Sequence, residues 1–507
     1  MARRNFARGI RHAIRDYAIF ERLWRMPIPP YKIRKNYVVV VKQRTDMGFA
    51  HLGIMLLAIF ATGCVSPSAH KPKGYGEFVP PANWHAEGLE THKVETLREL
   101  VDSTELATLF DLALTGNPNL KQVGLRVSEA NAIVRASRGA RLPTLDLSVQ
   151  HQTSSTTGMR SRGLRTSQHA GSLSKKTAAG SFWSNLEIDL WGRLGDGVRA
   201  SELDADARRA DYEGARISLV AEVIRQVLSI LSADKIIALE EKRLNTLILN
   251  KQFIRDRYLA GLGSLSDLEA ARTELAQRRA ALHARRESQA ASHRALSVLL
   301  GRYGETLMLP TALVVKMPDT ALPITVIGRR PDLVAALARA GAADHEAHAA
   351  AKALLPRLSV SFNVFKTEST IDDMFGAKPI STLLVGIAAP LFRGGQLWAE
   401  RDRTIHATER AYWAYRETLL QALLEVEDAL GQEMSSREQS EVLLNAIGYA
   451  ERNRRIFEFR YREGIASIFD LLNAQQTAYD TQINLLDTNL ARDLNRVDLA
   501  VALGLGL

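Results

Sequence analysis

The most constraining feature of this chain is a pattern that occurs twice. Pro118 and Pro143 stand 25 residues apart, and Pro331 and Pro356 repeat this spacing with leucines at matching neighbouring positions. Further along each copy, the pattern R-Y-x-x-G-x-x-S-x-x-D-L begins once at Arg257 and once again in the second half. A fixed internal register is typical of a duplicated structural unit. The contents of that unit therefore bound what the chain can fold into.

Each copy changes its hydrophobic period from that of a helix to that of a strand. Residues 104–141 carry apolar side chains at helical spacing, and after Pro143 the residues Leu145, Leu147 and Val149 alternate with polar ones. Such alternation predicts a strand with one apolar and one polar face. The same alternation predicts three further strands, at residues 182–190, 358–364 and 383–391.

Very long helices separate these strands. Breaker residues are sparse between Val198 and Tyr258, and about 60 helical residues at ~1.5 Å each span about 90 Å. A helix of that length exceeds an ordinary globular core and is typical of a coiled coil. The expected helices are 198–258, a return over 267–300 after turns at Gly261 and Gly263, 331–355, 395–461 after the motif PLFRGG, and a return over 470–503 after Gly464.

The charge of the chain is concentrated at its beginning. The whole sequence has a formal net charge of +10, but residues 1–64 hold 12 basic and 3 acidic residues and account for +9 of it. The remaining body is nearly balanced, so it has no general electrostatic reason to bind a phosphate backbone. Nucleic acid is therefore not an expected partner.

Residues 1–63 end as a bacterial export signal does. Lys42 and Arg44 precede an apolar run over 52–61, and small residues then lead to Cys64, the only cysteine. The run is about half of the ~20 residues that a spanning helix needs, so we expect a signal peptide rather than an anchor. The segment resembles a lipobox, which implies that Cys64 carries lipid and begins the mature chain.

The residues after Cys64 bear on the destination of the chain. Val65-Ser66 lacks the aspartate that favours retention in the inner membrane of such lipoproteins, which implies sorting to the outer membrane. We expect residues 64–103 to form a lipid-anchored N-terminal linker.

Four alternating strands on a lipidated chain make a transmembrane β-barrel plausible. Strands of such barrels turn apolar residues to lipid and polar residues to the lumen. Open sheet edges are not tolerated in lipid, and about eight strands are the lower limit for closure. Four strands per chain therefore require oligomerisation, and the count permits a dimer with eight strands or a trimer with twelve.

The chain resembles the TolC/OprM-type outer-membrane efflux channels, in the lipoprotein branch that serves tripartite pumps of the RND type. The resemblance covers about residues 104–507 and rests on NPNL…LP, DLWGR, RRPDL, PLFRGG and the two R-Y-x-x-G-x-x-S-x-x-D-L segments. It implies a mixed α/β membrane protein, a homotrimer whose twelve-stranded transmembrane β-barrel is continued by a long α-helical periplasmic barrel. The implied organisation is a first repeat over 104–300, an equatorial connection over 301–330 and a second repeat over 331–507.

The two helix tips are the main candidate sites. Tyr and Asp side chains at such a turn can hydrogen-bond a neighbour, and a trimer would repeat each aspartate as a ring of carboxylates, a device for cation selectivity. The resemblance implies a periplasmic gate there, and the tips are also the expected contact for a periplasmic adaptor. The alternatives are that the aspartates only cap their helices and that the tips are plain solvated turns. The candidate residues are Tyr258, Gly261, Asp267, Tyr461, Gly464 and Asp470.

The second tip departs from the family pattern at two positions. Ala466 stands where some members carry an arginine of the gate network, and Asn473 stands where some carry a second aspartate. The lock between the tips is therefore expected to be weaker or differently wired.

Four other segments invite an interpretation. The polar stretch 151–180 is expected to be a long loop that either constricts the exit or is simply solvated. His345 and His348 share a helix face, but without further ligands nearby in sequence they are expected to be solvated rather than metal ligands. The motif GRLGDG at 192–197 lacks the Lys-Ser/Thr of a phosphate loop and is expected to be a strand-to-helix turn. Arg329-Arg330 is expected to anchor a helix start.

These features favour a passive outer-membrane outlet for small toxic compounds, coupled through an adaptor to an inner-membrane transporter. One alternative is the duct of a type I protein secretion system, and another is a periplasmic coiled-coil structural lipoprotein, which predicts no strands. An enzyme is disfavoured because no convergent nucleophile, base or metal set appears in the sequence, and no cofactor is expected.

Overall fold

The computed structural model describes one part of the chain. The chain divides into two compact units, residues 1–66 and 67–507, and all described residues lie in the second. Cys64 and the signal segment lie outside the described residues, so lipidation stays a prediction. The described residues are 81, 84, 92–156, 173–304, 308–319, 323–368 and 378–507.

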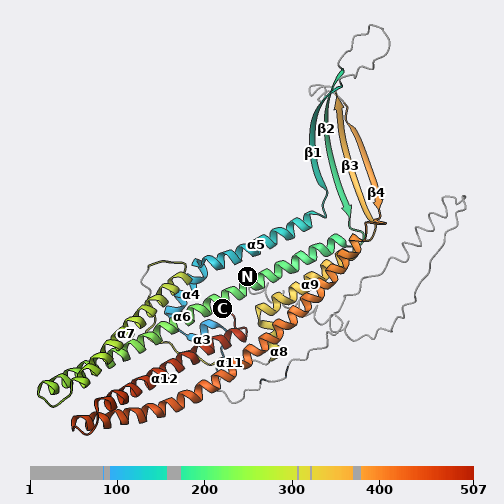
Figure 1. Ribbon diagram of the computed structural model, residues 1–507. Coiled ribbons are helices and arrows are strands. Elements are labelled where there is room, and N and C mark those ends of the chain that lie inside the picture. Colours follow the sequence, from blue (N-terminus) through green and yellow to red (C-terminus); the bar gives the residue numbers. More distant parts are fainter. Residues whose placement is uncertain are drawn as a thin grey trace, which may run out of the picture. The chain divides into compact units, whose positions relative to one another are not determined.

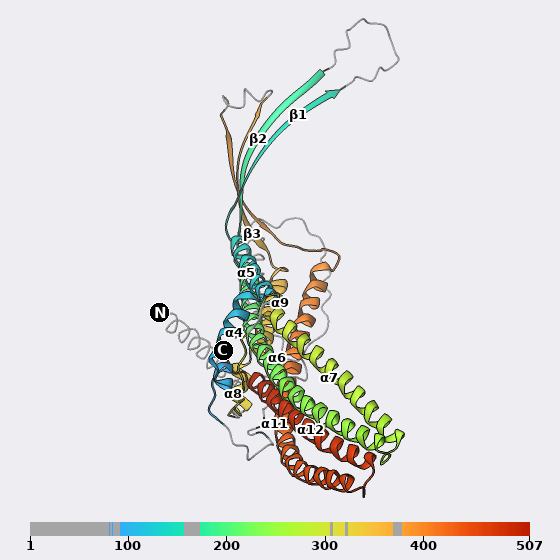
Figure 2. The same cartoon turned by 90° about the vertical axis from the view of Figure 1, so that its left-hand side faces the viewer.

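The described residues form nine helices and four strands. Helices of equal length occur in the two halves of the chain: α5 and α9 have 22 residues, α6 and α11 have 67, and α7 and α12 have 35. Figures 1 and 2 show that α6 with α7, and α11 with α12, form long hairpins. The elements are α3 (Leu97–Val101), α4 (Thr104–Gly116), α5 (Pro118–Gly139), β1 (Thr144–Thr156), β2 (Leu173–Ile188), α6 (Arg193–Leu259), α7 (Leu265–Leu299), α8 (Pro323–Arg329), α9 (Pro331–Lys352), β3 (Arg357–Glu368), β4 (Ile380–Ala388), α11 (Gln396–Arg462) and α12 (Ile468–Ala502).

Among the described residues, no helix combines the length and the apolar composition needed to cross a membrane.

The four strands form one antiparallel sheet in the order β1-β2-β3-β4 (Figure 1). Its register aligns the apolar residues of neighbouring strands. Leu147 pairs with Phe182, which pairs with Val364, and Leu358 pairs with Ile387 at the other end of β3. Since successive side chains point to opposite faces, these pairings gather the apolar residues on one face of the sheet. The expected amphipathic strands are therefore present.

The first hairpin is longer than the sequence indicated. Residues 151–156 and 173–180 were expected to lie in a loop, but His151 pairs with Ala178 and Thr156 pairs with Leu173. Main-chain hydrogen bonds, rather than apolar side chains, hold this part of the ladder, so polar composition did not reveal the strands. Only residues 157–172 of the expected loop lie outside the described residues.

Two strands end earlier than expected. The alternation suggested that β2 continues to Leu190 and β4 to Leu391, but β2 ends at Ile188 and β4 at Ala388. Pro390 has no backbone N–H to donate to a ladder. At the end of β2, Asp189 is instead used to begin the next helix.

The DLWGR motif connects β2 to α6. The Asp189 carboxylate accepts hydrogen bonds from the N–H groups of Leu194 (3.0 Å) and Gly195 (2.7 Å), which are free at a helix start. Gly192 turns the chain with φ 75°, and the Trp191 Nε1–H donates to the carbonyl oxygen of Pro356 (2.7 Å) in the second half. Helix α6 thus begins at Arg193. Of the turn expected over residues 192–197, only Gly192 lies outside the helix.

The main hydrophobic core lies around the middle of α6, where Ile224 is fully buried. The N-terminal segment, the connection between the halves and the C-terminus meet there. His92 forms a parallel bridge with Pro318, and Thr96 forms one with Gly506. Buried side chains from all three segments join the same core.

The expected anchoring role of Arg330 is confirmed. Its buried guanidinium donates to Asp332 (2.7 Å), to Glu425 on α11 (2.7 Å) and to the carbonyl oxygen of Ala502 (3.1 Å). Arg330 thereby ties the start of α9 to both α11 and the end of α12.

Candidate functional site at the helical tips

Both hairpin tips turn through the same backbone motif. The N–H of Gly261 donates to the Tyr258 carbonyl (3.0 Å), and the N–H of Leu262 donates to the Arg257 carbonyl (2.8 Å). This is a Schellman ending, which needs a left-handed residue after the helix. Gly261 supplies it with φ 73°. In the second tip Gly464, with φ 76°, makes the corresponding bond to the Tyr461 carbonyl at 3.1 Å.

The returning helices are capped by serines rather than by the candidate aspartates. Ser264 accepts from the N–H of Asp267 (3.0 Å), and Ser467 accepts from the N–H of Asp470 (3.1 Å). Asp470 nevertheless takes part in capping, because its carboxylate accepts a hydrogen bond from the Ser467 N–H (3.0 Å) and completes a capping box. The corresponding reciprocal bond from Asp267 is absent among the described residues.

These bonds give the two aspartates different electrostatic settings. The hydrogen bonds from Ser467 hold the pKa of the exposed Asp470 carboxyl below its ordinary value. Asp267 is half-buried, and its charge acts on Tyr461 of the other hairpin. The first tip therefore presents an aspartate that is not engaged in capping, whereas the second tip uses its aspartate to hold its own helix.

The two candidate tyrosines also differ. Tyr461 is 7% exposed and packs in a small core with Ile254, Leu268 and Leu471, whereas Tyr258 is 38% exposed. Burial raises the pKa of the Tyr461 hydroxyl. Tyr461 thus joins the two hairpins within one chain, and Tyr258 remains accessible.

Arg257 crosses from the first tip to the second. Its guanidinium carbon lies 5.6 Å from the ring centre of Tyr461 and 6.0 Å from that of Phe253. The Nη1–H donates to the Tyr461 carbonyl (3.4 Å) and the Nη2–H to the Leu262 carbonyl (3.3 Å). Arg257 was not among the predicted site residues, although it is the first residue of the repeated tip pattern.

Two residues of the second hairpin, Ala466 and Asn473, differ from the family pattern, and the structure shows their surroundings. Ala466 is half-buried and packs against the Tyr461 core, so a small apolar residue fills this position. Asn473 is exposed on α12. In this chain Arg257 supplies a cationic link from the opposite hairpin.

A polar seam above the tips joins α6 to α12. The Arg243 guanidinium is nearly fully buried and lies 2.9 Å from an oxygen of Asp480. Farther toward the tips, the Asn250 amide donates to the buried Gln475 (2.8 Å). This seam was not predicted, although the helical spacing of Arg243, Thr246 and Asn250 places them on one face of α6.

Apolar side chains are exposed at both tips. Leu262 is 69% exposed in the first, and Ile465 and Phe469 are 64% and 60% exposed in the second. Each turn therefore carries large apolar side chains that are mostly exposed in the single chain.

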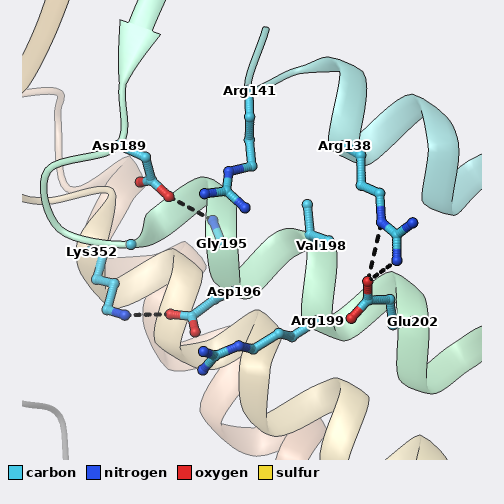
Figure 3. Close-up of a pocket in the computed structure, with 10 residues that line it drawn as sticks. Arg138, Arg141, Asp189, Gly195, Asp196, Val198, Arg199, Glu202 and Lys352 are labelled. Carbon is cyan, nitrogen blue, oxygen red and sulfur yellow. Dashed lines mark hydrogen bonds and ion pairs between the residues drawn. The ribbon is translucent and has the colours of Figure 1, made fainter.

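A second polar region lies where the strands meet the helices. A cavity of about 550 Å³ there is lined by side chains of α5, α6 and α9 (Figure 3). The Arg138 guanidinium contacts Glu202, and the Lys352 ammonium lies 2.5 Å from an oxygen of Asp196. Arg141 and Arg199 also line the cavity.

The expectation that His345 and His348 form a solvated helix face is wrong. Both are half-buried, and Nδ1 of His345 lies 3.3 Å from Oδ1 of Asp196. Asp196 precedes His345 by 149 residues, so spacing in the sequence could not bring these groups together.

Comparisons with known proteins agree with this architecture. The family model described as "Outer membrane efflux protein" matches residues 109–302 and 322–505. The cation efflux system protein CusC of Escherichia coli is 24% identical over 464 residues, covering 89% of this chain and 97% of that protein. The pyoverdine export outer membrane protein OpmQ of Pseudomonas putida is 26% identical over 466 residues, covering 89% and 96%.

A solved structure shares the fold. The Campylobacter jejuni CmeC outer membrane channel has a TM-score of 0.73 and 20% identity, covering 85% of this chain and 94% of that chain. The four strands exclude the coiled-coil lipoprotein alternative, which required none. The family model covers most of the chain, so this protein belongs to the outer membrane efflux protein family and is an outer-membrane efflux channel that extends into the periplasm.

Proposed function

We propose that three copies of this chain form one passive outlet, with a twelve-stranded barrel in the outer membrane and a helical conduit below it. The observation that carries the proposal is the amphipathic sheet with two open edges. Among the described residues, β1 and β4 each have a strand neighbour on one side only, and Leu147 and Leu383 on them are 75% and 67% exposed.

The open edges cannot remain open in a membrane. Unpaired N–H and C=O groups each cost several kcal/mol in hydrocarbon, so β1 of one copy must pair with β4 of another. Eight strands in a dimer and twelve in a trimer both satisfy this requirement. The resemblance to trimeric channels favours twelve.

The long hairpins supply the periplasmic conduit, and their tips control its entrance. Asp267 and Asp470, repeated by threefold symmetry, would each form a carboxylate ring that favours cations. Tyr258 is accessible to a neighbouring copy, and Gly261 and Gly464 give the tips their tight turns. The exposed apolar residues of the tips are the proposed contact for a periplasmic adaptor, which connects the channel to an RND-type inner-membrane transporter.

The cargo is proposed to be a class of small solutes. CusC is named for cation efflux and OpmQ for pyoverdine export. Cations and pyoverdine are both small compared with a secreted polypeptide. Because CusC and OpmQ have nearly equal sequence identity to this chain, overall sequence similarity favours neither cargo. Lipid on Cys64 and an equatorial belt over residues 301–330 complete the proposed assembly.

Cysteine crosslinking across the sheet edges tests the oligomer. In a Cys64→Ser background, Leu147→Cys on β1 is combined in turn with Leu383→Cys, Val385→Cys or Ile387→Cys on β4, and membranes are oxidised. We expect one register to give covalent dimers and trimers and nothing larger, because the ring closes at three.

The matched control uses two strands that pair within one chain. Phe182→Cys with Val364→Cys occupies a β2–β3 register pair and is expected to crosslink only within monomers. Crosslinked products no larger than a dimer would refute the trimer. So would the absence of any crosslink between copies for all three β1–β4 cysteine pairs. Channel conductance of the trimer in planar bilayers then tests passive conduction.

A further inference from the structure

Three groups that commonly ligate metal ions meet at the junction of α6 and α9. Asp196 lies in the first turn of α6 and is 4% exposed, and His345 and His348 lie near the end of α9. One candidate ligand atom from each residue lies within 4.8 Å of the others. The two imidazole rings stand edge to face with centres 6.0 Å apart.

One side of this triangle already has the dimensions of a metal site. Ligands at ~2.0–2.1 Å in a tetrahedral zinc site stand about 3.3 Å apart. Oδ1 of Asp196 and Nδ1 of His345 are 3.3 Å apart, which is longer than usual for a hydrogen bond between nitrogen and oxygen. A ligand atom of His348 lies within 4.8 Å of both of these residues.

The neighbouring groups prepare the carboxylate for such a ligand. Lys352 Nζ lies 2.5 Å from Oδ2 of Asp196 (Figure 3), so it fixes the carboxylate and leaves Oδ1 directed to His345. This is the arrangement in which an outer partner orients a metal ligand. Lys352 therefore does not have to be displaced when an ion binds.

A second observation concerns a ring nitrogen of His348. Nε2 of His348 is buried and has no hydrogen-bond partner among the described residues. Burying a polar atom without a partner is unfavourable, because its hydrogen bonds to water are lost and not replaced. A metal ion between the two helices would satisfy this atom.

We propose that Asp196, His345 and His348 bind one divalent transition-metal ion per chain, with zinc as the best match to two imidazoles and a carboxylate. The ion joins α6 of the first half to α9 of the second, directly below the sheet. Binding requires both histidines in the neutral form and releases any proton held by a ligand nitrogen. Water completes the coordination. The site is independent of the proposed export function.

Metal binding by the purified full-length protein tests this site. The detergent-solubilised protein is stripped with a chelator, and Zn²⁺ is titrated by calorimetry while Co²⁺ is followed by its visible absorption. We expect one ion per chain, a tetrahedral Co²⁺ spectrum and a higher melting temperature with Zn²⁺. His345→Ala and His348→Ala should each weaken binding at least about tenfold.

His406→Ala is the matched control. His406 also lies on a long helix beside a carboxylate, 3.2 Å from Glu409, but it is exposed. This variant should bind like the parent. Circular dichroism and complex mass should be unchanged in all variants, so that lost binding does not reflect misfolding.

Equal binding by the parent and by a folded His345→Ala/His348→Ala double variant would overturn the proposal. So would an octahedral Co²⁺ spectrum that persists in the double variant, because the ion would then lie elsewhere. Asp196→Asn gives a further check, since it keeps the side-chain volume and should lower affinity without abolishing the fold.

Discussion

The guanidinium carbon of Arg257 lies 5.6 Å from the ring centre of Tyr461, although 204 residues separate them. This contact connects the tip of α6 to the tip of α11 within one chain. A cation over an aromatic ring contributes about 0.5–2 kcal/mol. If the closed entrance depends on hairpins held side by side, this contact is a determinant of closure.

We expect Arg257→Ala to favour the open channel by about two- to thirtyfold, since ~1.4 kcal/mol corresponds to a tenfold change in equilibrium. Single-channel recordings in planar bilayers would detect a higher open probability. Arg460→Ala is the matched control, because Arg460 occupies the equivalent position and lies over Phe457 of its own helix, 5.8 Å from the ring centre. Equal effects of both variants would argue against a specific cross-hairpin lock.

Substitutions of the two tip aspartates should affect different properties, with Asp267 affecting cation selectivity and Asp470 affecting the stability of the α12 start. Asp267 is not engaged in capping, so Asp267→Asn should reduce cation selectivity, measured as reversal potential in a salt gradient, with little change in melting temperature. Asp470 stabilises its own helix start, so Ser467→Ala should cost about 0.5–2 kcal/mol locally, and Asp470→Ala should weaken the same helix start. Hydrogen exchange at residues 468–471 would report that loss. An unchanged reversal potential in Asp267→Asn would remove this residue from the conduction path.

The capping interaction of Asp470 also carries a pH dependence. The pKa of Asp470 is lowered in the folded tip, so its contribution is fully present above the ordinary aspartate pKa. It is lost as the pH falls through the lower folded value. Exchange protection at the start of α12 should therefore persist at neutral pH and decline only under clearly acidic conditions.

The buried Arg243 makes the α6–α12 seam sensitive to substitution. Its guanidinium contacts Asp480 at 2.9 Å and also lies near Glu240 and Glu274. Arg243→Met leaves the buried Glu240 without its countercharge, so we expect a loss of about 3–5 kcal/mol in the free energy of unfolding. Asp480→Asn should cost less, because the two glutamates remain. Thermal unfolding in detergent distinguishes them, and equal losses would contradict this ranking.

The sequence predicted the elements well where local pattern decides them. The long helices follow from sparse breakers, and the turns at Gly261 and Gly464 follow from the need for a left-handed residue after a helix. The prediction fails where main-chain pairing decides the structure, as in β2, because the polar first half of this strand has the composition of a loop. Contacts between the two halves could not be predicted from the sequence either. The contact of Arg257 with Tyr461 and that of Asp196 with His345 both depend on how helices that are distant in the sequence pack together.

Asp493 on α12 gives the chain a second pH response, of opposite sign to that of Asp470. Burial raises the pKa of this carboxyl to about 6, against the opposing effect of Arg496, Lys235 and Arg492, while Glu433 acts in the same direction as burial. A raised carboxyl pKa means that the folded state holds the proton more tightly than the unfolded state. This group therefore disfavours folding above pH 6 and ceases to do so as the pH falls below about 4.

Asp493→Asn should accordingly stabilise the protein at pH 7–8 and flatten the dependence of stability on pH between about 4 and 7. Because one pKa unit corresponds to about 1.4 kcal/mol, the gain should not exceed about 3 kcal/mol. Melting temperatures measured across this range provide the test. Asp498→Asn is the control, since Asp498 is exposed and paired with Arg225 at 2.7 Å, and it should be neutral or destabilising. A parent-like pH profile in Asp493→Asn would show that another group carries the response.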